Sequence, residues 1–225
     1  LQGLQACRCL SSKQHALQKH ELSIRSCVRL GAAALRIGKI VTTTLPRSPI
    51  LPAFSNLANL VHDIDNLSYE GFAVRPEHLD RNGHMNIGYY SVIFDQALDL
   101  PWPLLGLGYD NIAPDGRGGH STFALESHVT YQHEVRLGDP LDFSFQVIDI
   151  DAKRVHYFMT MLHRRDRWLA ATLESISMCI DMSTRRSAPW PAEPAERLRV
   201  VYEAHRQRPR PAEVGRTVGI RRTPA

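Results

Sequence analysis

A chain of 225 residues with 43% apolar side chains has room for one domain with a sizeable core, flanked by extensions. Eight Lys/Arg and one acid precede Asp63, whereas eighteen acids and eleven Lys/Arg lie between Asp63 and Arg186. The part expected to fold is therefore acidic, which argues against a nucleic-acid surface. The cysteines lack metal-type pairing and no apolar run reaches the ~20 residues of a membrane span. We expect no metal, no cofactor and no membrane partner, and a reduced, cytoplasmic location.

Residues 1–61 differ from the rest in composition, because they are rich in Arg, Ser and Ala and almost devoid of acids. A mitochondrial-type presequence has this composition. An over-extended reading frame or an expression artefact would also produce it, and we favour that interpretation. We therefore expect residues 1–61 to be a disordered or non-native extension outside the fold.

Residues 62–190 carry the pattern of a folded domain. A short strand is expected over 68–74. Asn86 is a good N-cap for a helix that Pro101 ends, and Val92 next to Ile93 suggests burial on most sides. The apolar positions at helical spacing are Ile87, Tyr90, Phe94, Ala97 and Leu98. A Gly- and Pro-rich loop over 101–119 is long enough to be a lid.

Four strand-like segments follow, and their order predicts an α+β fold in which a four-strand antiparallel meander curves around one long helix. The segments are 122–135, 141–150, 155–162 and 168–182. In the first segment the alternation places Phe123, Leu125, Val129 and Tyr131 on one face. Residues 191–225 are expected to add a short helix over 195–206 and a basic tail.

The run 77–86 carries the chemistry. It places a carboxylate, two carboxamides and an imidazole on one tight turn where a helix begins. Asp80 is the candidate base or nucleophile, and free N–H groups at Asn86, Ile87 and Gly88 could stabilise an oxyanion. In its commoner role, an aspartate before Asn-Gly caps its own turn.

The neighbours of Asp80 have two interpretations each. His84 could act as an acid or base, orient Asp80, or be purely structural. Asn82 could position a water molecule or simply form the turn, and Asn86 is most simply a cap. Gly116, Gly118 and Gly119 suggest a mobile loop more than a phosphate loop, because the Walker lysine is absent.

The run 80–86 followed by Tyr89 and Tyr90 resembles the helix-start motif of the hot-dog acyl-CoA thioesterases (4-hydroxybenzoyl-CoA thioesterase-like), in which the catalytic Asp lies. Its spacing is also similar to that of plant acyl-carrier-protein thioesterases, which gives weight to Asn82, His84 and Glu134. Segments 125–131, 151–156 and 215–220 look most like the betainyl-CoA thioesterases of carnitine breakdown. The likeness spans residues 69–191. Trp102 and the stretch 110–119 lengthen the lid relative to that subgroup.

The resemblance implies a homodimer or homotetramer with active sites at subunit interfaces, where Glu134 or Thr122 acts in trans to Asp80. The substrate-binding candidates are Tyr89, Tyr90, Trp102, Thr122, Phe123, Glu126 and Tyr131. An aromatic cage for a trimethylammonium group could also draw on Tyr109, Asp95 and Asp99. CoA would be held by exposed basic residues, for which Arg117, Lys153 and Arg154 are candidates.

The expected activity is hydrolysis of a short-chain acyl-CoA thioester, with betainyl-CoA as a candidate substrate. One alternative is a non-catalytic acyl-CoA-binding or regulatory module. Another is a hot-dog enoyl-CoA hydratase, but those enzymes have one more residue between their Asp and His than separates Asp80 from His84.

Overall fold

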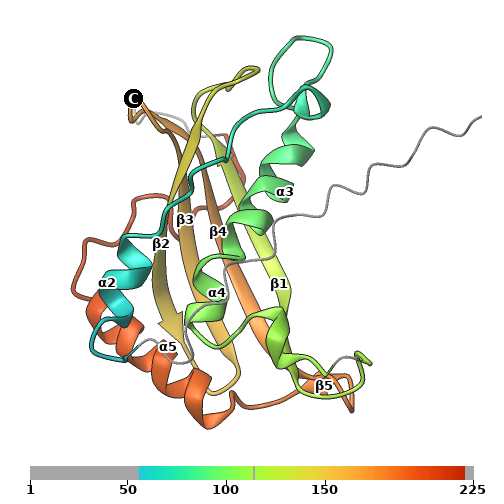
Figure 1. Cartoon of the computed structure of the whole chain (residues 1–225). Coiled ribbons are helices and arrows are strands. Elements are labelled where there is room, and N and C mark those ends of the chain that lie inside the picture. The colour runs from blue at the N-terminus through green and yellow to red at the C-terminus, as the bar shows by residue number, and fades with distance from the viewer. Residues whose placement is uncertain (1–55, 114, 221–225) are drawn as a thin grey trace, which may run out of the picture. The chain divides into compact units, whose positions relative to one another are not determined.

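A long helix lies across one face of an antiparallel sheet (Figure 1). The computed structural model describes residues 56–113 and 115–220, so most of the expected extension lies outside the described residues. The helices are α2 (Leu60–Asp65), α3 (Ile87–Leu98), α4 (Pro101–Leu104) and α5 (Ala192–His205), with short 3-10 turns η1 (Pro76–His78) and η2 (Tyr109–Asn111). The strands are β1 (His120–Tyr131), β2 (Leu141–Ile150), β3 (Arg154–His163), β4 (Leu169–Asp181) and β5 (Arg186–Ser187).

The sheet has the order β1-β4-β3-β2, and β5 pairs with β4 outside this path. The prediction of a four-strand meander is therefore wrong for its first connection, because β1 pairs with β4 and not with β2. Tight turns hold β2, β3 and β4 side by side, as expected. The segment 132–140 instead crosses the end of the sheet, and its Val135 is fully buried. Residues far apart in the sequence pair in β1 and β4. The alternation of apolar and polar residues along β1 therefore could not predict its partner strand.

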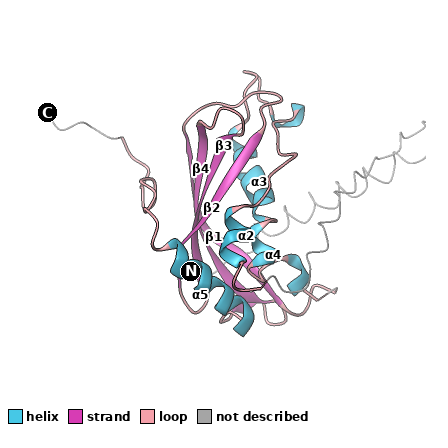
Figure 2. Ribbon diagram, turned by 60° about the vertical axis from the view of Figure 1, so that its left-hand side comes forward, coloured by secondary structure: helices cyan, strands magenta, loops and turns pink. Residues whose placement is uncertain are grey.

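The helix α3 begins where the sequence predicts. The Asn86 side chain accepts a hydrogen bond from the Gly88 N–H at 2.9 Å, which is a normal N-cap. Ile93 and Phe94 are buried against the sheet, but Ile87 is 68% and Val92 45% exposed. The helix is thus buried on one face only, not on most sides. Figure 2 shows α2, α3 and α4 on the same side of the sheet.

A β-bulge between Ala124 and Glu126 changes the faces of β1. A bulge adds one residue to the strand, so alternation resumes on the opposite face beyond it. As a result Phe123 does not share a face with Val129 and instead lies under the Arg185 guanidinium. Leu125, at the bulge, is 51% exposed. The predicted apolar face of this segment was wrong for these two residues.

Three further segments differ from expectation. Residues 68–74 form no strand, only a single bridge between Ala73 and Pro140. Leu60, within the stretch we excluded, is fully buried as the first residue of α2. The expected lid over 101–119 contains α4 and buried leucines, because their apolar side chains complete the core beside α3. These are Leu104, Leu105 and Leu107.

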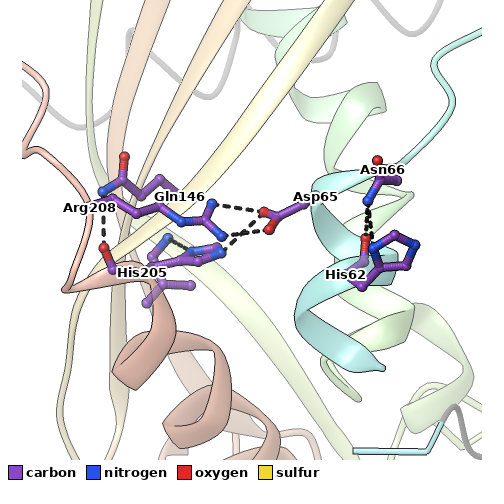
Figure 3. A network of polar contacts seen from close by, with 7 residues as sticks. His62, Asp65, Asn66, Gln146, His205 and Arg208 are labelled. Carbon is purple, nitrogen blue, oxygen red and sulfur yellow. Dashed lines mark hydrogen bonds and ion pairs between the residues drawn. The ribbon is translucent and has the colours of Figure 1, made fainter. Parts of the chain in front are cut away.

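The helix α5 packs against β2 and α2, so the region after residue 191 belongs to the same core. Its buried His205 links these elements (Figure 3). His205 Nδ1 accepts the Val147 N–H at 2.9 Å, and Nε2 lies 3.5 Å from Asp65 Oδ1. Arg208 donates two hydrogen bonds to the same Asp65 carboxylate. A neutral imidazole suits this site, because protonating Nδ1 would break its bond from Val147.

This network makes folding stability sensitive to mild acid. Burial, helped by Arg208 and opposed by Asp65, lowers the pKa of His205 from 6.5 to about 4. The unfolded chain therefore takes up a proton between these pH values that the folded chain does not. We expect the free energy of unfolding to be highest above pH ~6.5 and to fall towards pH ~4 by up to ~3 kcal/mol from this group. Urea unfolding at several pH values measures this change in the free energy of unfolding.

His205→Asn is the control, because its amide oxygen can accept the Val147 N–H but cannot titrate. The variant should lose part of the pH slope between 4 and 6.5, the two pKa values of His205. An unchanged slope would mean that His205 does not cause the dependence.

Candidate functional site

The turn before α3 is closed by its own backbone. The Asp80 N–H donates to the His84 carbonyl at 2.9 Å, and the Gly83 N–H donates to the Asp80 carbonyl at 3.2 Å. Gly83 has a φ of +78°, a left-handed conformation that glycine adopts at little cost. The Met85 N–H donates to the Val135 carbonyl at 3.0 Å, which ties the turn to the segment after β1. The turn is therefore held both locally and by the sheet.

The Asp80 carboxylate is anchored through one oxygen. Its Oδ1 accepts the Asn82 N–H at 2.7 Å and the His84 N–H at 3.4 Å. Its Oδ2 receives a longer contact of 3.5 Å from the Asn82 side-chain amide. Asp80 thus caps its own turn, as in the commoner role of an aspartate before Asn-Gly. The same bonds orient the half-buried carboxylate and leave Oδ2 as its less engaged oxygen.

His84 and Glu134 meet within one chain. His84 Nδ1 lies 3.0 Å from Glu134 Oε2, and the other Glu134 oxygen accepts a hydrogen bond from Arg136 at 3.2 Å. Within one chain Glu134 therefore contacts the imidazole of His84, whereas its expected action in trans to Asp80 stays a prediction. This chain of contacts connects the turn to the end of β1.

The N-terminus of α3 offers fewer free donors than expected. The Asn86 N–H donates to the His78 carbonyl at 2.9 Å, and the Gly88 N–H is taken by the Asn86 cap. The Ile87 N–H lies in the first turn, where no intrahelical acceptor exists. Among the three proposed oxyanion donors, Ile87 is thus the one whose N–H remains without an acceptor in the described residues.

Aromatic side chains border the turn. The Tyr89 ring lies 5.0 Å from the imidazole of His78, and Tyr90 and Tyr131 meet edge to face at 5.0 Å. Burial raises the pKa of Tyr90, so its hydroxyl stays neutral at physiological pH. The structure therefore places two of the predicted substrate-binding residues, Tyr89 and Tyr90, in the first turn of α3, with Tyr131 against Tyr90.

Other predicted residues lie elsewhere. Trp102 packs edge to face on Phe145 and Tyr157 in the core. Glu126 is exposed near the middle of β1. The strand register places Thr122 beside Cys179, at the end of the sheet opposite Tyr131.

The CoA-binding candidates also lie away from Asp80. Lys153 and Arg154 belong to the β2–β3 turn at that same far end, where Arg154 pairs with Asp151. Arg117 is exposed in the loop before β1. One chain alone does not bring these basic residues to the turn.

Sequence reasoning missed two neighbours of the turn. His78 is buried, accepts the Arg75 N–H through Nδ1 and contacts Tyr89. Arg136 forms an ion pair with Glu134. The only sign of this pair in the sequence is that Arg136 lies two residues after Glu134. In the described part of the chain, no three metal-binding side chains gather, and no helix has the length and hydropathy to span a bilayer.

The chain is similar to known thioesterases. Residues 74–198 match the model of the thioesterase-like superfamily. A Pseudomonas aeruginosa betainyl-CoA thioesterase is 33% identical over 65% of this chain and 91% of its own length. A Rhizobium meliloti L-carnitine dehydrogenase/betainyl-CoA thioesterase is 29% identical over 64% of this chain, which spans 28% of that longer protein.

A solved structure agrees with these matches. A Staphylococcus aureus protein crystallised in complex with CoA is 30% identical, has a TM-score of 0.59, and aligns with 67% of this chain and 92% of its own. The predicted α+β hot-dog fold and thioester hydrolase activity on acyl-CoA are confirmed. The chain belongs to the thioesterase-like superfamily.

Proposed function

We propose that this protein hydrolyses a short-chain acyl-CoA, with betainyl-CoA as its leading substrate, at a site that two copies of the chain complete. The observation that carries the proposal is the Asp80 carboxylate, which is anchored through Oδ1 at the start of α3. A cytoplasmic location is part of the proposal.

In the proposed reaction, Asp80 Oδ2 takes a proton from water while the oxygen adds to the thioester carbonyl. The Ile87 N–H and the positive end of α3 stabilise the oxyanion. Collapse of the intermediate breaks the C–S bond, and the proton on Asp80 passes to the leaving thiolate. Direct attack by Asp80, followed by hydrolysis of the anhydride, fits the same geometry.

The substrate proposal rests on the named relatives and on charge near α3. Burial and the nearby Asp95 carboxylate raise the pKa of Asp99. Burial also raises the pKa of Tyr109, helped by both carboxylates. Two acids beside an exposed aromatic ring suit a trimethylammonium group, as in betaine. Asp99 lies at the opposite end of α3 from the Asp80 turn, so in the proposed dimer these groups would serve the Asp80 of the other copy.

The proposal of a dimer rests on β1. This strand pairs with β4 on one side, and in the described residues no strand pairs with its other edge. Leu125, 51% exposed, lies on β1, and Val92, 45% exposed, lies on α3. A free edge with apolar neighbours is a surface for strand pairing. Antiparallel pairing of two β1 strands would bring Thr122 of one copy towards Tyr131 of the other.

Asp80→Asn tests the catalytic role. The amide oxygen can still accept the Asn82 and His84 N–H groups, so the turn should persist, but the amide cannot accept a proton. We expect turnover of betainyl-CoA or short acyl-CoA to fall about 10²–10⁴-fold with little change in melting temperature. Release of CoA thiol measures turnover.

Asp181→Asn is the matched control, because Asp181 also accepts an N–H two residues on, from Ser183 at 2.8 Å, at the far end of the sheet. It should retain normal turnover. Substantial activity in Asp80→Asn, or acyl-CoA binding without hydrolysis by the unmodified protein, would contradict the proposed function.

A double-mutant cycle tests the contact between His84 and Glu134. If Glu134 acts by orienting His84, then His84→Ala, Glu134→Gln and the double variant should lower kcat/KM by similar factors, about tenfold each. Such non-additivity is typical of residues that act as one unit. If the double variant instead lowers kcat/KM by the product of the two single-variant factors, His84 and Glu134 act independently.

His156 and Glu174 provide the control pair for this cycle, since they form a similar contact at 2.8 Å away from Asp80. His156→Ala and Glu174→Gln should leave kcat/KM near the normal value. A loss as large as that of the His84 variants would point to a general effect on the fold.

Leu125→Glu tests whether β1 joins two copies. A charge on the apolar edge should convert dimers to monomers in analytical ultracentrifugation, keep the circular dichroism spectrum and abolish most hydrolysis. Val218→Glu is the control, because Val218 is 91% exposed in the tail. A fully active dimer of Leu125→Glu would exclude this interface.

A further inference from the structure

The chain after α5 crosses the face of the sheet that points away from α3. Figure 2 shows this segment on the opposite side of the sheet from α2, α3 and α4. We call residues 206–215 the strap and this face of the sheet the outer face. Gln146 on β2, Phe158 on β3 and Glu174 on β4 pair in register and form one row of the outer face. Met159, the neighbour of Phe158, belongs to the core on the other side.

The strap is anchored at both ends of this row. At its start, the Gln146 side-chain amide donates to the His205 carbonyl at 3.4 Å. At its end, the Gly215 N–H donates to both oxygens of the Glu174 carboxylate, at 3.0 and 2.8 Å. The His156 imidazole contacts the same carboxylate at 2.8 Å. Hydrogen bonds to a charged acceptor are stronger than neutral ones, so Glu174 is the latch of the strap.

The strap accounts for the burial of Phe158. The other outward-pointing side chains of β3 are exposed or half-buried, and these are Arg154, His156, Thr160 and Leu162. Phe158, in the middle of this series, is 3% exposed. The two anchors of the strap lie on the neighbours of Phe158 in its row, Gln146 and Glu174. The chain between the anchors therefore passes over the Phe158 ring.

The sequence of the strap suits this task. Pro209 and Pro211 each fix one backbone angle, which lowers the entropy lost when the strap docks. Gly215 has a φ of +79°, and a Cβ there would meet nothing within 4 Å. Glycine adopts this left-handed conformation at little cost. The latch therefore needs glycine for its backbone conformation and not for space.

The surface under and beside the strap is apolar. Ile176 and Met178 are half-buried on the outer face of β4. Phe123, which is 40% exposed, is the register partner of Met178. Phe158 is the diagonal neighbour of Ile176, so it would join this group if the strap left the sheet. A continuous exposed apolar patch of this kind marks a surface for contact with a protein.

The charges of the outer face suit a second copy of the same face. Arg154 and His156 lie on β3, whereas Glu126 lies on β1 and Glu174 on β4. Two such faces related by a two-fold axis can place the basic residues of each copy against the acidic residues of the other. Sheets commonly pack face to face in this way. The face is therefore self-complementary in both apolar and charged groups.

We propose that the strap is a cover held by Glu174, and that while it is latched it keeps the outer face from packing on the outer face of a second copy. Release of the strap exposes Phe158 and lets two such faces associate. This contact differs from the pairing of β1 edges and does not involve the Asp80 turn. In the proposed dimer, the latched strap would limit the assembly to two copies. That link rests on the proposed function, whereas the strap itself does not.

Gly215→Val and Gly215→Asn give a matched test in the full chain. Neither side chain has a close neighbour, but a β-branched residue is strained at a φ of +79° and asparagine tolerates it. The protection factor of the amide at position 215 against hydrogen exchange should be about five- to thirtyfold lower in Gly215→Val than in Gly215→Asn. In sedimentation velocity at about 100 μM, Gly215→Val should form species of about twice the mass of the unmodified protein. Gly215→Asn should keep the unmodified mass.

Ile176→Lys ties this association to the outer face, because it places a charge beside Phe158. Added to Gly215→Val, it should restore the unmodified mass without restoring the protection of the amide. Equal protection in the two Gly215 variants would exclude the latch. Lower protection with an unchanged mass, or a doubled mass that persists in the double variant, would exclude the outer face as the surface that the strap covers. Both measurements are made without substrate, so they hold whether or not the chain hydrolyses betainyl-CoA.

Discussion

The packing of α3 on the sheet positions the remainder of the site. Phe94 is fully buried and meets Phe143 with ring centres 5.8 Å apart, so the helix cannot rotate without exposing its apolar face. Burying each such side chain contributes about 1.5–3 kcal/mol. With the helix fixed, its N-terminus falls beside Val135, whose carbonyl binds the Met85 N–H. The Asp80 turn is thereby held between the helix and the sheet.

In the proposed reaction, this arrangement gives Asp80 two roles. Its Oδ1 stabilises the turn, and the same bonds fix the orientation of the carboxylate. A structural cap and a catalytic base are therefore compatible in one residue. The aromatic rings of Tyr90 and Tyr131 meet edge to face where α3 begins and β1 ends.

The two ends of β1 carry different chemistry. At one end Tyr131 packs on Tyr90 of α3, and at the other end the first residues of β1 line a cavity together with Trp190. In a single chain these features lie at opposite ends of a strand. In the proposed dimer, the edge of β1 that no described strand pairs with would bring them together, and the exposed Leu125 would lie at the interface.

The sequence by itself determined the local features: the Asn86 cap, the tight turn around Gly83 and the β2–β3 hairpin. Each depends on side-chain and backbone bonds within a few residues, and such bonds can be recognised from residue types and spacing. The resemblance to hot-dog thioesterases then identified the fold class and singled out Asp80. The contact between His84 and Glu134 was only partly foreseen, since their roles were assigned to different chains.

Only the tertiary structure decided which strands pair, which face each side chain takes and which donors stay free. The choice of β4 as the partner of β1 is a long-range interaction, and the bulge at Leu125 reverses an alternation that otherwise looks regular. The cavity joins residues from Gly106 to Pro194, which no local pattern relates. The Asn86 N–H donates to the His78 carbonyl, which is brought to the helix start only when the chain folds, whereas the Gly88 N–H is bound by the local Asn86 cap.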